Sequence, residues 1–396
     1  MKRAIIFASL ALLAVSFAEA QNPAVVTNNN KMAFTLFNAN YDELGNTLLS
    51  PLSINIAMAM TYEGAKGSTA KEFIKVLGFD KNKKLHHDAW VSLIKAYAGR
   101  DSSELEIANA LMAQQEYQFR IEFFKSLEEY GALVQYANFK NETDRDAARR
   151  NLNYWISERT HQKINDLIKK DTFDELTRLV VVNAIYFRAK WSIAFEPKKT
   201  RQMMFYSPGK QLVCHFMHGR EYYNFYEDSI IQAVELPYSG NRFSMVVILP
   251  KSGINIRSFS TIFGVDQYNE VMGKLKKQHV DVLLPMFAVS DESSLKKVFQ
   301  DLGMVNAFSG KANFKLITGH TDLLIDDILH KTYIKIDESG TEAAGSTAVI
   351  IREKSAPSDK PVFFNANRPF FYLIKDNNSG AILFIGSINK PEKNGK

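Results

Sequence analysis

The spacing of apolar residues predicts helices in the first part of the chain. Apolar residues recur every three or four positions from Phe34 to Leu44, and the asparagines at 28–30 can supply an N-cap for this helix. A second helix is expected from Asp144 to Ile164, where an apolar stripe lies opposite a row of arginines. The stripe consists of Leu152, Trp155, Ile156 and Ile164, and the arginines are Arg149, Arg150 and Arg159.

Strand patterns dominate the rest of the chain. Four runs rich in β-branched and aromatic residues are bounded by Pro, Gly or Asn, at 179–187, 243–249, 280–289 and 381–388. Several are apolar on both faces, which is typical of strands in the middle of a sheet covered by helices. Because helices concentrate before residue 175 and strands after it, we predict an α+β fold. No linker-like segment or internal repeat divides the chain, so a single domain is expected.

The composition indicates how large a core the chain can form, and its first residues indicate where the protein is located. With 396 residues, 46% of them apolar, the chain can bury a large core. Residues 1–20 combine Lys2 and Arg3 with an apolar run and the small-x-small ending Ala18-Glu19-Ala20, which is typical of a secretory signal peptide. We therefore expect a secreted, extracellular protein whose mature domain is 21–396. No later run is long enough to predict a membrane span.

Few residues suggest covalent or metal chemistry. Cys214 is the only cysteine, so neither an intrachain disulfide nor a zinc site with several thiolates is expected, and burial as a small apolar residue is favoured over reactivity. Asn141 and Asn377 each begin an N-glycosylation sequon. The formal charge of +6 becomes +5 without residues 1–20, which gives no reason to expect a nucleic-acid partner.

The sequence contains no recognisable catalytic motif. The eight histidines form no HExxH pair, and no GxSxG elbow, phosphate-binding loop or CxxC motif is present. Asp326, Asp327 and His330 lie close together, but no nucleophile accompanies them. We therefore predict that the protein is not an enzyme, that it needs no metal or cofactor, and that His330 is a core histidine with satisfied hydrogen bonds.

The segment Asp337–Ser355 begins like a strand and continues with Gly, Ala, Ser and Thr. With a period of two, one face carries small residues such as Thr341, Ala343 and Gly345, whereas Glu342 falls on the other face. Gly and Ala are poor strand formers, so the segment suits two states: a surface loop, or a strand inserted into a sheet. The simpler alternative is a small-residue loop between two strands.

This segment resembles the hinge and reactive loop of the serpins, the serine protease inhibitors. The resemblance extends along the mature chain through 49–60, 183–195 and 364–374, which are similar to the shutter helix, a central strand and the C-terminal serpin signature. It implies the serpin fold: a single domain with a large central β-sheet, two further sheets, about eight to nine helices, and an exposed reactive-centre loop at about 338–362.

The resemblance also implies site residues. The shutter, which closes the central sheet, would be Ser50, Ser53, Asn183 and His330, and Trp191 would mark the breach, where the loop enters the sheet. The hinge would be Glu338, Gly340, Thr341, Glu342, Ala343, Ala344 and Gly345. The lysine that often pairs with the hinge glutamate is replaced by Met286, so the hinge is expected to open more easily.

Serpins are suicide inhibitors, in which a protease cleaves the loop and is trapped as an acyl-enzyme when the loop inserts as a strand. Family spacing of seventeen residues, counted from Glu338, places the P1 residue at Lys354 and P1′ at Ser355. A basic P1 residue fits a trypsin-like protease. Arg352 is the competing P1 residue, and it would shorten the inserting strand by roughly 7 Å.

Two basic clusters lie where some serpins bind heparin. The first is Lys81, Lys83, Lys84, His87 and Lys95, around the segment resembling helix D. The second is Lys274, Lys276 and Lys277, where helix H is expected. A heparin-like glycosaminoglycan is therefore a candidate activator, and a merely solvated lysine-rich surface is the alternative.

The expected partner is a trypsin-like serine protease held in a covalent acyl complex by a monomeric inhibitor. A secreted, disulfide-free serpin with a basic P1 residue resembles the arthropod haemolymph inhibitors of clip-domain proteases in Toll and melanisation cascades. The rival prediction is a non-inhibitory serpin that carries or stores a small ligand. Carriers tend to have hinges with bulky or charged inward residues, and this hinge has none.

Overall fold

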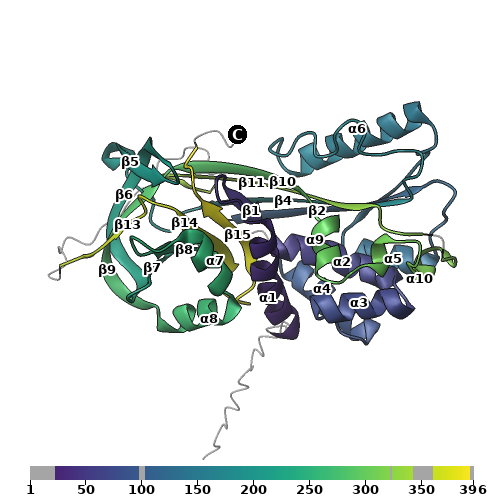
Figure 1. Ribbon diagram of the computed structural model, residues 1–396, viewed down its shortest axis with the longest axis horizontal. Coiled ribbons are helices and arrows are strands. Elements are labelled where there is room, and N and C mark those ends of the chain that lie inside the picture. Colours follow the sequence, from purple (N-terminus) through teal and green to yellow (C-terminus); the bar gives the residue numbers. More distant parts are fainter. Residues whose placement is uncertain (1–22, 98–102, 322, 342–359, 393–396) are drawn as a thin grey trace, which may run out of the picture.

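Figure 1 shows the computed structural model, which describes residues 23–97, 103–321, 323–341 and 360–392. In these ranges the chain forms one domain with two β-sheets and ten α-helices. Helices α9 and α10 are short, and the eight longer ones agree with the expected eight to nine. The helices are α1 (Pro23–Asn40), α2 (Pro51–Gly64), α3 (Gly67–Leu77), α4 (Lys83–Tyr97), α5 (Ile121–Glu129), α6 (Glu142–Arg159), α7 (Ile256–Ile262), α8 (Val265–Lys274), α9 (Lys296–Asp301) and α10 (Lys315–Thr318). None of these described helices has the length and apolarity that a membrane crossing needs.

The central sheet has six strands in the order β10-β11-β12-β4-β2-β3. They are β10 (Phe287–Ser294), β11 (Asp327–Asp337), β12 (Gly340–Thr341), β4 (Leu179–Lys190), β2 (Ser103–Gln114) and β3 (Leu133–Ala137). Strand β4 is buried on both faces along nearly its whole length. This burial explains why its sequence is continuously apolar rather than alternating.

The remaining described strands join into one nine-stranded sheet instead of the two further sheets expected from the sequence. They are β1 (Thr47–Leu49), β15 (Ile382–Ile388), β14 (Phe370–Asp376), β8 (Phe243–Pro250), β7 (Ile231–Pro237), β6 (Lys210–Glu227), β9 (Lys276–Pro285), β13 (Val362–Asn365) and β5 (Arg201–Ser207). The long strand β6 pairs with β7 near its end and with β9 over its middle. It thereby connects two groups of strands that would otherwise be separate sheets.

The apolar runs at 179–187, 243–249 and 381–388 are strands, as predicted. The run at 280–289 is not one strand, because Pro285 ends β9 and β10 begins at Phe287 in the other sheet. Proline cannot donate to a strand ladder, so the chain leaves the first sheet at this residue.

Helices cover both faces of the central sheet (Figure 1). Helix α6 lies on one face and buries Leu152 and Ile156 in a small core, while α2 lies against the other face within the main core. The structure starts α6 at Glu142, capped by the side chain of Asn141, and ends it at Arg159. The sequence predicted that this helix would extend to Ile164. This residue is buried in the small core, but it lies beyond the end of α6.

The predicted N-cap at residues 28–30 is wrong. These asparagines lie inside α1, which begins at Pro23 and ends at Asn40, before the exposed Leu44. The buried amides of Asn29 and Asn30 donate to the carbonyl oxygens of Ile382 (3.0 Å) and Gly380 (2.8 Å). They connect α1 to the start of β15 and so satisfy polar groups that would otherwise be buried without partners.

Candidate functional site at the junction of β4 and β11

Strands β4 and β11 meet in two different ways along their length. At the closed end, defined as 180–185 with 327–332, the two strands pair directly and in parallel. At the hinge end, defined as 189–190 and 336–337 with 340–341, the short strand β12 lies between them and is antiparallel to both. Gly340 and Thr341 of the predicted hinge therefore already lie in the sheet.

The closed end is linked by hydrogen bonds around His330. The backbone N–H of Ser50, the N-cap of α2, donates to Nε2 of His330 (3.2 Å), so Nδ1 carries the proton and donates to Oδ1 of Asn183 (2.5 Å). The amide of Asn183 donates to Oδ1 of Asn109 (2.5 Å) and to the carbonyl oxygen of Ser53 (3.1 Å). The structure thus brings the four predicted shutter residues together. Asn109 was missed, because an asparagine in a strand pattern gives no signal of such a contact.

Burial lowers the pKa of His330 to about 3, so its imidazole is neutral near pH 7. The neighbouring carboxylates accept hydrogen bonds from other residues: Asp326 accepts from the backbone N–H of Leu179 (3.2 Å), and Asp327 accepts from the hydroxyl of Ser294 (2.7 Å). His330 is therefore a core histidine with satisfied hydrogen bonds, as predicted. No group of three or more His, Cys, Asp and Glu side chains in the described ranges is arranged to hold a metal ion.

The hinge end is built on aromatic rings. Trp191 stacks on Tyr238 with centroids 4.6 Å apart and planes 7° from parallel, and its indole N–H donates to the carbonyl oxygen of Asp337 (2.9 Å). The hydroxyl of Tyr238 is 2.6 Å from Oγ1 of Thr341, and both residues are fully buried. Tyr238 follows β7 of the other sheet, so sequence patterns gave no indication that it meets the hinge.

Gly340 occupies a position where a side chain would clash with the backbone of β4. Its φ of +150° is unfavourable for other residues, and a Cβ atom would lie against the Ala189 carbonyl and 2.8 Å from Cα of Lys190. Glycine therefore allows the hinge to pass closely between β4 and β11.

Within the described ranges Glu338 forms no ion pair with a lysine, the partner that the resemblance to serpins would imply. Its carboxylate accepts a hydrogen bond from the hydroxyl of Thr200 (2.7 Å), and its carbonyl accepts from the N–H of Phe195 (3.0 Å). Met286, at the lysine position, is partly buried against the core. The other predicted hinge residues (Glu342, Ala343, Ala344 and Gly345) and the residues Arg352, Lys354 and Ser355 lie outside the described ranges.

One lysine of the first basic cluster packs inside the protein. Lys83 was expected on a basic surface, but its ammonium donates to the carbonyl oxygen of Glu63 (3.0 Å) and lies 4.1 Å over the ring of Tyr62. The last carbonyls of α2 lack helical partners, which explains why a cation packs there, and burial lowers the pKa of Lys83 to about 8. The expectation for Lys83 is therefore wrong.

Other members of the first cluster have acidic neighbours. His87 lies between the carboxylates of Glu63 (3.4 Å) and Glu129 (3.3 Å), and Lys84 pairs with Asp88 (2.7 Å). Lys81 and Lys95 remain exposed. In the second cluster Lys274 pairs with Glu270 (2.5 Å), whereas Lys276 and Lys277 are exposed at the start of β9. The second cluster therefore presents its charge to solvent more fully than the first.

The two sequons differ in their contacts. Asn141 uses its side-chain oxygen to cap α6, with the N–H of Asp144 at 3.0 Å, which leaves its amide nitrogen for a glycan. The amide nitrogen of Asn377 already donates two hydrogen bonds, to Asn241 (2.8 Å) and to Ser244 (2.7 Å).

The one cysteine, Cys214, is buried, and this burial raises the pKa of its thiol, in agreement with the predicted unreactive cysteine.

The two central strands are thus paired directly at one end and hold the two-residue strand β12 between them at the other. The family model described as Serpin (serine protease inhibitor) matches residues 27–391. The chain therefore belongs to the serpin family, whose fold needs no cofactor.

Three relatives illustrate the match. An uncharacterized serpin-like protein of Thermococcus kodakarensis is 33% identical over 384 residues, which cover 94% of this chain and 87% of the relative. The structure of Serpin48 from the insect Tenebrio molitor has a TM-score of 0.83 and 28% identity, and covers 95% of this chain and 100% of that one. Human thyroxine-binding globulin, solved with its hormone, has a TM-score of 0.84 and 26% identity over 93% of this chain and 98% of that one.

Proposed function

We propose that the protein is an inhibitory serpin that traps a trypsin-like serine protease. The observation that carries the proposal is the seated hinge: Gly340 and Thr341 already occupy the place of a new strand between β4 and β11. The serine hydroxyl of the protease would attack the Lys354 carbonyl, break the bond to Ser355 and form an acyl ester. Ser355 would keep the released amine, and the loop would then insert from Thr341 onward.

Lys354 is the proposed P1 residue, and Arg352 is the alternative. A basic side chain suits an S1 pocket with an acid at its base. Glu353, at P2, would be unfavourable for many trypsin-like enzymes and so would narrow the range of targets.

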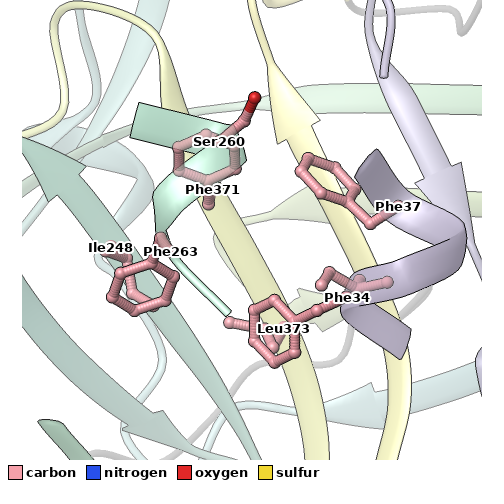
Figure 2. A pocket seen from close by; sticks show the side chains of 8 residues that line it. Phe34, Phe37, Ile248, Ser260, Phe263, Phe371 and Leu373 are labelled. Carbon is pink, nitrogen blue, oxygen red and sulfur yellow. The ribbon is translucent and has the colours of Figure 1, made fainter. Parts of the chain in front are cut away.

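The rival function is carriage of a small ligand, as in thyroxine-binding globulin. Figure 2 shows an apolar cavity where Phe34 and Phe37 of α1 face Phe263 and Phe371. The space open to the centre of a water molecule there is only about 10 Å³, which is about enough for one water. A hormone-sized ligand would require these aromatic rings to move apart, so the cavity does not favour the carrier.

Mixing the protein with trypsin tests the proposal. We expect a band near the combined mass that survives denaturing electrophoresis, and a released C-terminal peptide that begins at Ser355. Lys354→Gln should remove this band, while Arg352→Gln should keep it. Cleavage without a stable complex, or a cleaved protein that melts no higher than the intact one, would contradict inhibition by loop insertion.

We further propose that residues 1–20 direct secretion and that Asn141 carries a glycan more readily than Asn377. A secreted inhibitor of this specificity suits a clip-domain protease of a Toll or melanisation cascade. Covalent complexes captured from the native fluid would identify the target, and a target outside these cascades would overturn the assignment.

Heparin-like polyanions are proposed to bind at Lys274, Lys276 and Lys277. All three of these lysines are exposed, whereas the ammonium of Lys83 in the first cluster bonds inside the protein, and this difference favours the second cluster. Binding should weaken with salt because condensed counterions are released. The double variant Lys276→Gln, Lys277→Gln should elute earlier from immobilised heparin than Lys311→Gln, which removes an exposed charge elsewhere. Equal elution would exclude this site.

A further inference from the structure

Tyr238 contacts the hinge from the other sheet. Its hydroxyl is 2.6 Å from Oγ1 of Thr341, which lies between Ile336 of β11 and Ala189 of β4. Either hydroxyl can donate in this pair. Because both residues are fully buried, each hydroxyl would lose its hydrogen-bond partner if the hinge shifted.

The ring of Tyr238 is held firmly in place. It stacks on Trp191, and Phe187 of β4 lies edge-on with a centroid distance of 5.3 Å and an angle of 73°. The backbone is fixed on both sides, since Ser192 N–H donates to Pro237 O (2.9 Å) and Ser239 N–H donates to Lys190 O (2.8 Å). The hydroxyl of Tyr238 is therefore a fixed reference point beside the place where a new strand begins.

From these contacts we infer that Tyr238 is a positioning residue, which seats the hinge and sets the register of the strand that inserts after cleavage. This inference rests on the proposed inhibitory function. With Thr341 at Tyr238, a strand of period two points Ala343 and Gly345 inward. A slip of one residue would instead place the carboxylate of Glu342 at this buried position.

A slip of two residues is also disfavoured. It would place Ala343 beside Tyr238, and alanine has no hydroxyl to pair with the phenol. Burial raises the pKa of Tyr238 well above its ordinary value, so the phenol stays protonated and able to donate. Of the observed register and these two slips toward the C-terminus, only the observed one pairs both hydroxyls. The contact therefore favours one register without adding bulk to the path of the strand.

A double-mutant cycle with Tyr238→Phe and Thr341→Val tests the inference. The measured quantity is the number of inhibitor molecules consumed per trypsin molecule inhibited, which rises when insertion is slow and the acyl-enzyme hydrolyses. We expect each single variant to raise this number at least twofold. Adding Tyr238→Phe to Thr341→Val should change it less than 1.3-fold, because the hydrogen bond is already absent. Thr341→Ser, which keeps the hydroxyl, should behave like the parent.

Tyr372→Phe is the matched control, because this tyrosine is also fully buried and its hydroxyl has no hydrogen-bond partner within the described residues. It should leave the stoichiometry unchanged. If Tyr238→Phe has no effect, or has the same effect in both Thr341 backgrounds, Tyr238 acts through packing alone and the inference fails.

A second measurement separates this inference from the proposed function. Hydrogen exchange at 336–341 in the resting protein requires no protease, and Tyr238→Phe should accelerate it at least fivefold, whereas Tyr372→Phe should not. Faster exchange in a protein that never forms a stable trypsin complex would refute inhibition while supporting the seating role. Unchanged exchange and stoichiometry in an active inhibitor would refute the role of Tyr238.

Discussion

The closed end and the hinge end of the β4–β11 junction use different interactions. At the closed end, His330 and Asn183 form a hydrogen bond across two directly paired strands, in a fully buried network without formal charge. At the hinge end, stacked rings of Trp191 and Tyr238 lie beside a strand of two residues. One end has short directional bonds that a new strand must break, and the other end already accommodates a strand.

Under the proposed function, this difference explains how one sheet can be stable and still accept an inserted strand. Neighbouring strands lie about 4.8 Å apart, so a strand inserted between β4 and β11 would separate them to about 9.6 Å. The 2.5 Å hydrogen bond between His330 and Asn183 cannot survive that separation. Insertion should therefore start at the hinge end, where nothing of this kind must break, and the closed end should supply the barrier that keeps the native state kinetically trapped.

The largest expected effect comes from blocking the hinge end with a charge. Thr341→Arg would place a guanidinium at a fully buried position beside Tyr238. We expect the protein to become a substrate, with the stoichiometry of inhibition of trypsin raised at least tenfold. Glu342→Arg, expected on the opposite face of the inserting strand, is the control and should change the stoichiometry less than twofold. Similar effects of the two variants would show that the stoichiometry of inhibition depends on the charge of the loop and not on which face of the inserting strand carries it.

The next effect concerns the closed end. His330→Leu leaves the N–H of Ser50 and the Oδ1 of Asn183 buried without their partner. Each unsatisfied group costs about 1–3 kcal/mol, so we expect the free energy of unfolding to fall by about 3 kcal/mol in denaturant titrations. The variant should also convert spontaneously to an inactive, inserted form faster than the parent. His279→Leu removes a buried histidine far from the junction and should not accelerate this conversion. If both variants lose inhibitory activity at the same rate, the closed end does not supply the barrier to spontaneous loop insertion.

The sequence predicted one strand of the junction, β4, but neither its partner β11 nor the contacts that make the two ends different. The apolar run at 179–187 identified β4, because a strand buried on both faces has a strong local signal. Asn183 and His330 emerged through resemblance to a family, not through periodicity. Tyr238 gave no signal, because its contact with Thr341 joins residues 103 positions apart in different sheets. Lys83 was wrongly predicted to belong to a basic surface, because only tertiary packing brings its ammonium to the end of α2.

A smaller effect should appear with pH at the closed end. The unfolded imidazole of His330 takes up a proton below about pH 6.5, whereas the folded one does so only near pH 3, so protonation favours the unfolded state as the pH falls. Between pH 7 and pH 5.5 this difference should lower the free energy of unfolding by about 1.3 kcal/mol. His86, whose pKa is also lowered to about 3 by burial, should contribute similarly. In His330→Leu the pH-dependent loss should therefore be about half that of the parent, and an unchanged loss would contradict a neutral His330.

The smallest effect tests the departure from the family at the hinge end. Met286 directly precedes β10, whose first residue Phe287 pairs with Ile336, so residue 286 lies beside the start of the hinge. Met286→Lys should bring an ammonium near Glu338, now held by Thr200, and stabilise the seated hinge by about 0.5 kcal/mol, the strength of a partly exposed ion pair. We expect hydrogen exchange at 336–341 to slow about twofold at low salt, with the gain lost at high salt. Met286→Gln controls for the loss of the apolar side chain and should show no salt-dependent slowing. If the lysine variant exchanges no more slowly than the glutamine variant, Glu338 is already fully satisfied by Thr200, and the missing lysine does not loosen this hinge.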